Sequence, residues 1–259
     1  MAADPSLRLH RAGTPGAPAL VLGNSLGTDR RLWHATVQAF ANDYEVIRFD
    51  APGHGGQDAF AFGSLRELAT RLAGALADAG IDTFRYCGVS MGAAIGMELA
   101  LTHGPRVSAL VLANTAPQFG PAAFWQGRID QVRAGGTGAI AEATVSRWLT
   151  PAHAARDPAL RQWLVDMFGA TTAAGYVACA QAVMAFDGRD ALRHIGVPTL
   201  VMAGTEDLAT PPAQGRALHA AIAGSQYLAL PAAHLAPLGA PDAFHRAVRD
   251  FLQATRANP

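Results

Sequence analysis

The chain has 259 residues, of which 50% are hydrophobic and only 15% are charged. Its 20 basic and 20 acidic residues cancel, so the composition offers no complementary charge to nucleic acid or to an anionic membrane surface. A chain of this length can bury one large core, and a small-molecule partner fits it better than a polyanion.

No apolar segment typical of a signal peptide occurs near the N-terminus, and no run of about 18 apolar residues is present. We therefore expect a cytoplasmic protein without a membrane partner. The two cysteines, Cys87 and Cys179, lack the close spacing of metal ligands. We expect no metal and no cofactor, and nothing in the sequence indicates an oligomeric state.

Short apolar runs bounded by turn residues alternate with longer helical patterns along much of the chain. This alternation predicts βα units and a mostly parallel sheet. Ser64 is suited to cap a helix over 64–79 that ends before Gly80, and a closing helix is predicted over 240–254. The predicted strands cover residues 19–22, 44–49, 85–89, 109–113, 199–203 and 226–230.

The segment 120–195 interrupts this alternation. It contains helical patterns at 127–134, 138–149, 158–170 and 172–186, and no convincing strand. We interpret it as a helical cap inserted between two strands. The predicted fold class is α/β, with a mostly parallel central sheet flanked by helices, a core of residues 1–119 and 196–259, and a cap of residues 120–195.

The most specific motif is Gly88-Val89-Ser90-Met91-Gly92, which follows a predicted strand and precedes a helical pattern. It matches the G-x-S-x-G nucleophile elbow, in which small residues permit a tight turn that exposes the serine hydroxyl. We predict Ser90 as the nucleophile of an α/β-hydrolase fold. The Met91 N–H, at the start of the helix, is a candidate oxyanion donor.

A second oxyanion donor is expected in the loop after an early strand. Residues 23–27, Gly-Asn-Ser-Leu-Gly, occupy this place, and we assign the role to the Leu26 N–H. The alternative is a plain glycine turn without a catalytic role.

In this fold the acid and then the histidine follow the serine along the chain. Asp207 and His234 have this order, and each comes shortly after a predicted strand. Glu206 is the rival acid and His245 the rival base. Another place where some hydrolases carry the acid, residues 112–115, holds no carboxylate. His54 is expected in a structural turn.

The sequence resembles the 3-oxoadipate enol-lactonases, α/β-hydrolases that open 3-oxoadipate enol-lactone in the β-ketoadipate pathway of aromatic-compound degradation. Two departures are Pro52, where the family carries arginine, and Ala236-Pro237, where more polar residues are expected. The matching stretches are 23–29, 87–92, 112–116, 147–151, 203–207 and 232–235.

The resemblance implies a lactone or ester substrate with a free carboxylate. A carboxylate is best held by a guanidinium, whose two parallel N–H groups match its geometry. Arg147 is our candidate, with Trp148, Trp125 and Ser25 as further substrate-binding residues. The alternative is that Arg147 faces solvent from a helix and that Trp148 only anchors the cap. Phe119 and Phe124 are suited either to line the pocket or to pack the cap.

The same triad serves other reactions, because fold does not fix substrate. A broad carboxylesterase, a thioesterase or a C–C bond hydrolase is the alternative enzyme, and faster turnover of simple aryl esters than of the enol-lactone would favour it. A hydrolase-like ligand sensor is the alternative from another class, and a single slow turnover that leaves Ser90 modified would indicate it.

Overall fold

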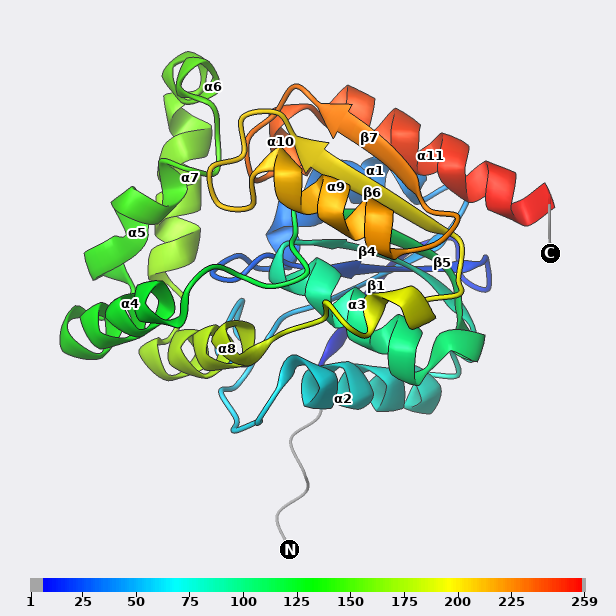
Figure 1. Ribbon diagram of the computed structural model, residues 1–259, viewed down its shortest axis with the longest axis horizontal. Coiled ribbons are helices and arrows are strands. Elements are labelled where there is room, and N and C mark those ends of the chain that lie inside the picture. Colours follow the sequence, from blue (N-terminus) through cyan, green and yellow to red (C-terminus); the bar gives the residue numbers. More distant parts are fainter. Residues whose placement is uncertain (1–6, 258–259) are drawn as a thin grey trace, which may run out of the picture.

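The computed structural model describes residues 7–257, which form a seven-stranded sheet with helices on both faces (Figure 1). The strand order is β1-β3-β2-β4-β5-β6-β7, and every neighbouring pair is parallel except β1 with β3. This confirms the predicted fold class. The strands are β1 (Leu9–Gly13), β2 (Ala19–Gly23), β3 (Glu45–Phe49), β4 (Phe84–Val89), β5 (Val107–Ala113), β6 (Thr199–Gly204) and β7 (Gln226–Leu230).

The sequence predicted six of these strands and missed β1. The sequence of β1 is Leu-His-Arg-Ala-Gly, and none of its residues is fully buried, so it lacks the apolar run by which the others were found. Its antiparallel pairing with β3 places it at the edge of the sheet, where a polar strand is tolerated.

The helices of the core lie on both faces of the sheet because the chain first adds strands toward one edge and then toward the other. It runs from β2 outward to β3 and then back to β4, and right-handed crossovers place the connecting helices on opposite faces. Helix α1 packs with α11, whereas α2 packs with α3, and α9 packs on β6 and β7. Their bounds are α1 (His34–Phe40), α2 (Leu65–Asp78), α3 (Met91–Thr102), α9 (Pro212–Ala221) and α11 (Pro241–Ala257).

The predicted start of α2 is confirmed. The Ser64 side chain accepts a hydrogen bond from the Glu67 N–H, and Gly80 just past the helix has φ 76°. The predicted closing helix is found as α11, and a short helix, α10 (Ala236–Gly239), precedes it. No helix within residues 7–257 is long and apolar enough to cross a membrane.

Five helices between β5 and β6 form the cap, which lies beyond one end of the sheet (Figure 1). The predicted helix over 138–149 is too long, because α5 ends at Val145. After it the N–H groups of Arg147 and Trp148 bond to carbonyls three residues back, and Thr150 then caps the next helix. Arg147 and Trp148 therefore lie in a loop. The helices are α4 (Ala122–Gly135), α5 (Gly138–Val145), α6 (Pro151–Arg156), which the sequence missed, α7 (Pro158–Gly169) and α8 (Ala173–Ala185).

Backbone hydrogen bonds tie the cap to the core. The Thr172 N–H donates to the Gly53 carbonyl at 2.9 Å, and the Leu235 N–H donates to the Trp148 carbonyl at 3.1 Å. Gln118 lies where the chain enters the cap and Asp187 where it leaves, and the two form an isolated antiparallel β-bridge. The division into core and cap at residues 120 and 195 stays a prediction.

Candidate active site

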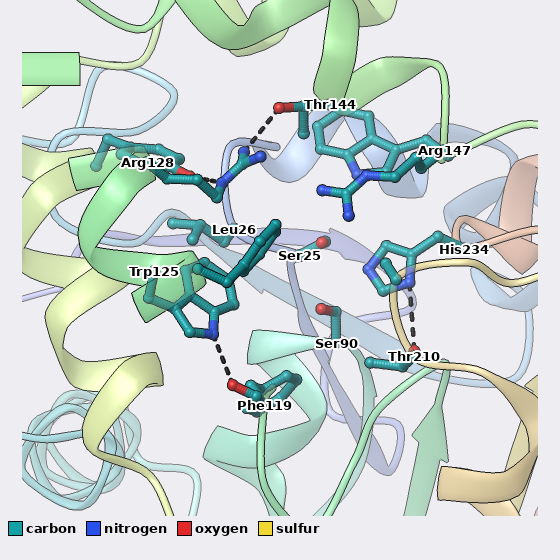
Figure 2. Close-up of a pocket in the computed structure, with 14 residues that line it drawn as sticks. Ser25, Leu26, Ser90, Phe119, Trp125, Arg128, Thr144, Arg147, Thr210 and His234 are labelled. Carbon is teal, nitrogen blue, oxygen red and sulfur yellow. Dashed lines mark hydrogen bonds between the residues drawn. The ribbon is translucent and has the colours of Figure 1, made fainter. Parts of the chain in front are cut away.

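The three residues predicted for catalysis follow three parallel strands. Ser90 comes directly after β4, Asp207 follows β6, and His234 follows β7. Because parallel strands end at the same edge of a sheet, their loops meet at that edge. Figure 2 shows Ser90 and His234 in one cavity, which both residues line.

Ser90 occupies a strained turn between β4 and α3. Its backbone has φ 57° and ψ −118°, a conformation that residues other than glycine rarely adopt. A Cβ atom on Gly88 would collide with the backbone of Gly92, and one on Gly92 would collide with the Gly23 carbonyl. The Ser90 N–H donates to the Ala113 carbonyl at 3.0 Å, which holds the turn against β5. The turn has the form that the G-x-S-x-G motif predicts.

The two predicted oxyanion donors lie on either side of this turn in the fold. Met91 is the first residue of α3, so its N–H has no partner within the helix, and its side chain is buried away from the cavity. Leu26 and Ser25 line the cavity from the turn after β2, which the Thr28 N–H closes by donating to the Ser25 carbonyl at 3.0 Å. The role of these two N–H groups as an oxyanion hole stays a prediction.

A buried histidine supports the turn that carries Leu26. The Gly27 N–H donates to His54 Nε2 at 3.1 Å, and His54 Nδ1 donates to the Pro52 carbonyl at 2.9 Å. These partners require a neutral ring with its proton on Nδ1. Burial lowers the pKa of His54 to about 4, against the opposing effect of the Pro52 carbonyl. His54 thus lies in the expected structural turn and also fixes the neighbouring one.

We expect this histidine to make the fold acid-sensitive. The unfolded chain protonates His54 near pH 6.5, but the folded protein does so only near pH 4. Stability is therefore full above pH 6.5 and falls by about 3 kcal/mol as the pH drops to about 4. Gln in His54→Gln can still accept from Gly27 but does not titrate, so this part of the pH dependence should disappear.

Urea unfolding at neutral pH and near pH 4 measures the effect. The control is His194→Gln, which changes an exposed histidine at the end of a short turn. An acid-side loss of stability that is equal in the wild type and His54→Gln would contradict the prediction.

Asp207 is surrounded by hydrogen-bond donors. Its Oδ1 accepts from the N–H groups of Ala209 at 2.8 Å and Thr210 at 2.9 Å. Its Oδ2 accepts from the Thr210 hydroxyl at 2.8 Å, Asn114 Nδ2 at 3.0 Å and His234 Nδ1 at 2.9 Å. Burial by itself would raise the pKa of Asp207, but the His234 ring and these donors outweigh it and hold the pKa well below its usual range. The carboxylate therefore stays ionised.

His234 is oriented by this carboxylate. Its side chain is 4% exposed, and its Nδ1 is bound to Asp207, which leaves Nε2 for the cavity. Within residues 7–257 no hydrogen bond joins the Ser90 hydroxyl to His234, although both side chains line the cavity. This geometry suits the predicted roles of a base with a fixed tautomer and a nucleophile in one cavity, and those roles stay a prediction.

Neither rival residue lies in the cavity. Glu206 is exposed on the loop beside Asp207. His245 lies on α11, where its Nε2 is 3.0 Å from the Thr36 hydroxyl and its ring packs edge-on against Phe40. The geometry therefore favours Asp207 and His234 as the acid and the base.

The cavity that Ser90 and His234 line has a volume of about 60 Å³ and is otherwise mostly apolar. Trp125 contributes only its ring, because its indole N–H donates to the Phe119 carbonyl at 2.6 Å. No acidic side chain among the described residues lines it. The lining includes Ser25, Leu26, Trp125, Arg147 and Trp148, which the sequence predicted, as well as Phe119 and Phe124.

A second arginine, Arg128, lies in the same cavity, and sequence reasoning missed it. Its Nε donates to the Tyr176 hydroxyl at 2.8 Å and its Nη2 to the Thr144 hydroxyl at 2.7 Å, so its position is fixed. The Arg147 guanidinium has no hydrogen bond or ion pair within the described part of the chain, and it lies 5.4 Å from the centroid of the Phe124 ring. Figure 2 shows the two guanidinium groups pointing toward one another across the cavity. Burial, followed by the charge of Arg128, lowers the pKa of Arg147.

Neither of the two departures from the family pattern lines the cavity. Pro52 supplies the carbonyl that fixes His54. Ala236 and Pro237 are buried at the start of α10, and neither lines the cavity. Within residues 7–257, no three His, Cys, Asp or Glu side chains are grouped so that they could hold a metal ion.

The fold is that of an α/β-hydrolase, with Ser90 on a strand-to-helix turn at the edge of the sheet. The sequence matches the family described as alpha/beta hydrolase fold over residues 18–241, and the chain belongs to that family.

The chain is similar to several proteins along nearly its whole length. The 3-oxoadipate enol-lactonase 2 of Acinetobacter baylyi is 34% identical over 254 residues, which are 97% of this chain and 95% of that protein. RutD of Klebsiella pneumoniae is 33% identical over 258 residues, which are 96% of each protein. The crystal structure of the enol-lactonase from Burkholderia xenovorans superposes with a TM-score of 0.93 at 37% identity, over 95% of this chain and 96% of that one.

Proposed function

We propose that the protein hydrolyses 3-oxoadipate enol-lactone to 3-oxoadipate through an acyl-serine intermediate. The proposal is supported by the similarity to two enol-lactonases over most of the chain. The observation that carries it is the cavity itself, in which Ser90 and His234 share one space with two guanidinium groups and no carboxylate.

Two cations without a counter-ion favour an anionic ligand. A charge that is partly removed from water is costly unless it is paired, and the like charges of Arg128 and Arg147 add to this cost. A substrate carboxylate placed between them would offset both costs. Arg128 is held rigidly by Tyr176 and Thr144, so it needs little reordering to bind. A lactone with a carboxymethyl arm supplies this anion a few bonds away from its carbonyl.

In the proposed reaction His234 takes the proton of the Ser90 hydroxyl as its oxygen attacks the lactone carbonyl. This step requires the Ser90 oxygen to come within hydrogen-bonding reach of Nε2, about 3 Å. The N–H groups of Leu26 and Met91 hold the negative oxygen, and each such donor is worth about 3 to 4 kcal/mol in comparable sites. Asp207 stabilises the charged His234 ring.

Collapse of the tetrahedral intermediate breaks the ring C–O bond. The leaving enolate takes the proton from His234 and tautomerises to the ketone. Water, activated by His234, then attacks the acyl-serine and releases 3-oxoadipate. The former ring oxygen stays attached to the acyl chain until 3-oxoadipate is released, so both parts of the substrate share the cavity throughout.

A rate comparison across enol-lactone, saturated lactones and aryl esters tests the proposal. We expect the highest kcat/KM for the carboxylated enol-lactone. Simple aryl esters that are turned over far faster than the enol-lactone would overturn the proposal in favour of a broad carboxylesterase.

We expect Arg147→Ala to lower kcat/KM for the carboxylated lactone by about 10- to 100-fold, the worth of a charged hydrogen bond. Neutral aryl esters should be affected little, because they do not use this charge. The control is Arg133→Ala, which removes an exposed arginine from α4. Equal losses on both kinds of substrate would remove Arg147 from the carboxylate role.

A further inference from the structure

Tyr176, on α8, has hydrogen-bonding capacity that the rest of the protein leaves unused. It lines the cavity together with Ser90 and His234, and it is fully buried. The hydroxyl oxygen accepts a hydrogen bond from Arg128 Nε at 2.8 Å. A phenol hydroxyl also carries one proton of its own, and the Tyr176 proton has no acceptor within residues 7–257. The oxygen of this hydroxyl is therefore engaged, whereas its proton is available to a ligand.

The second hydroxyl that holds Arg128 belongs to Thr144 and differs in this respect. It accepts from Arg128 Nη2 at 2.7 Å (Figure 2), but it donates its own proton to the Ile140 carbonyl at 2.7 Å. The indole N–H of Trp125 is likewise bonded to a carbonyl of the protein. Of the two hydroxyls that fix Arg128, only that of Tyr176 keeps a proton for the cavity.

The Tyr176 hydroxyl is a donor at neutral pH. Burial raises the pKa of the phenol above its usual value, and the positive charges of Arg128 and Arg147 oppose this effect without reversing it. The phenol therefore stays protonated. The Arg128 N–H that binds the phenol oxygen polarises the O–H bond, which makes the hydroxyl a stronger donor to a second partner. A bound ligand can supply that partner.

The position of Tyr176 is fixed by packing on two sides. Its ring lies edge-on to Phe168, with 5.5 Å between the ring centroids. The neighbouring Gly175 packs against the core so closely that a Cβ atom there would collide with the Pro52 carbonyl. A donor whose position is fixed before binding loses little freedom when a ligand arrives.

From these observations we propose that Tyr176 determines specificity for a carboxylate, because its hydroxyl donates to the substrate carboxylate that Arg128 and Arg147 attract. The inference deepens the proposed function and rests on its carboxylate-bearing substrate. The two guanidinium groups offer donors only, and the Tyr176 oxygen is already occupied by Arg128 Nε. A carboxylate has only acceptors and fits such a site, whereas the NH₂ group of an amide of the same shape would face donors.

Matched variants separate this role from the support of Arg128. Tyr176→Phe and Thr144→Val each remove one hydroxyl that accepts from Arg128, but only Tyr176→Phe removes a proton that is offered to the ligand. The probes are adipate, an open-chain dicarboxylate without a bond that a hydrolase can cleave, and adipamide, the neutral diamide of the same shape. Isothermal titration calorimetry measures the affinity of each protein for both probes.

We expect the wild type to bind adipate more tightly than adipamide. Tyr176→Phe should weaken adipate binding by about 10- to 100-fold, the usual effect of losing a hydrogen bond to a charged group, and should weaken adipamide binding far less. Thr144→Val should change the ratio of the two affinities by less than about threefold, because the cavity keeps all of its donors. Equal losses of adipate binding in the two variants would show that Tyr176 only holds Arg128, and would overturn the proposal. Unchanged adipate binding by Tyr176→Phe would overturn it as well.

Steady-state kinetics give a readout that general damage to the site would not imitate. For the carboxylated enol-lactone, Tyr176→Phe should raise KM by about 10-fold or more and leave kcat nearly unchanged, because the carboxylate is bound equally in the ground state and the transition state. Phenyl acetate has no carboxylate and should keep its kcat/KM. A parallel fall in kcat/KM for both substrates would contradict the specificity role.

The outcomes also separate this proposal from the lactone function. If Tyr176→Phe loses adipate binding but the wild type does not turn over the enol-lactone, the lactone function fails and the role of Tyr176 stands. If Tyr176→Phe turns over the enol-lactone with the KM of the wild type, the role of Tyr176 fails and the lactone function stands.

Discussion

Replacing Ser90 by alanine is expected to abolish turnover while the fold remains intact. In the proposed reaction the hydroxyl oxygen forms the acyl-enzyme, so its loss should lower kcat by at least about 10⁴-fold, as removal of a serine nucleophile does in other hydrolases. The strained turn at φ 57° is kept by alanine, and its supports, Gly88, Gly92 and the bond from the Ser90 N–H to Ala113, do not involve the hydroxyl. The free energy of unfolding should change by less than about 1 kcal/mol.

Steady-state rates and urea unfolding of the same preparation measure the two effects. Ser146→Ala is the matched control, because it removes an exposed hydroxyl outside the cavity and should retain most activity. A fluorophosphonate probe should label the wild type at Ser90 and leave Ser90→Ala unlabelled. Substantial turnover by Ser90→Ala would end the serine mechanism. A single slow turnover by the wild type would indicate a ligand sensor instead of an enzyme.

Replacing Asp207 by asparagine should cost about 10⁴-fold in kcat/KM, because the amide no longer holds His234 in the tautomer that accepts the Ser90 proton. All five groups that contact the carboxylate are hydrogen-bond donors. An asparagine must turn its NH₂ group either toward the N–H groups of Ala209 and Thr210 or toward Asn114 and His234. In each orientation the NH₂ group of the asparagine faces other N–H donors. We therefore also expect the free energy of unfolding to fall by about 1 to 3 kcal/mol.

The control for Asp207→Asn is the adjacent carboxylate. Glu206→Gln makes the same chemical change on an exposed side chain and should leave both rate and stability nearly unchanged. If Glu206→Gln lost the activity and Asp207→Asn kept it, Glu206 would be the acid. If Asp207→Asn kept most of its rate, the histidine would be oriented by another group, and Thr210 would be the first to examine.

The nucleophile turn and its partners show how far sequence reasoning reaches. The G-x-S-x-G motif located Ser90 because a tight strand-to-helix turn demands small residues at fixed positions in the chain. Asp207 and His234 were located by their order and by the strands before them. The strand β1 and the helix α6 were missed, because one lacks an apolar run and the other is a single short element after Thr150-Pro151. The helical pattern also continues past the true end of α5 at Val145, so the sequence predicted one helix over 138–149 and placed Arg147 on it.

Arg128, Asn114 and Thr210 carry no comparable signal. Arg128 lies on α4 and meets Tyr176 from α8 and Thr144 from α5, so its fixed position depends on how three helices of the cap pack. Asn114 was noticed only as a place without a carboxylate, yet its amide donates to Asp207 across 93 positions of sequence. Contacts over such separations depend on strand order and helix packing, which local patterns do not encode.

The sequence by itself determined the α/β class and the strand-to-helix turn at Ser90, because each depends on residues close together in the chain and on steric rules for short segments. It also predicted Asp207 and His234 as acid and base from their order along the chain. Only the tertiary structure decided which donors surround Asp207, that His54 supports the Leu26 turn, and that two guanidinium groups share the cavity with Ser90. Those features depend on where parallel strands end and on how the cap helices pack over them, and this arrangement is set by burial of the whole core.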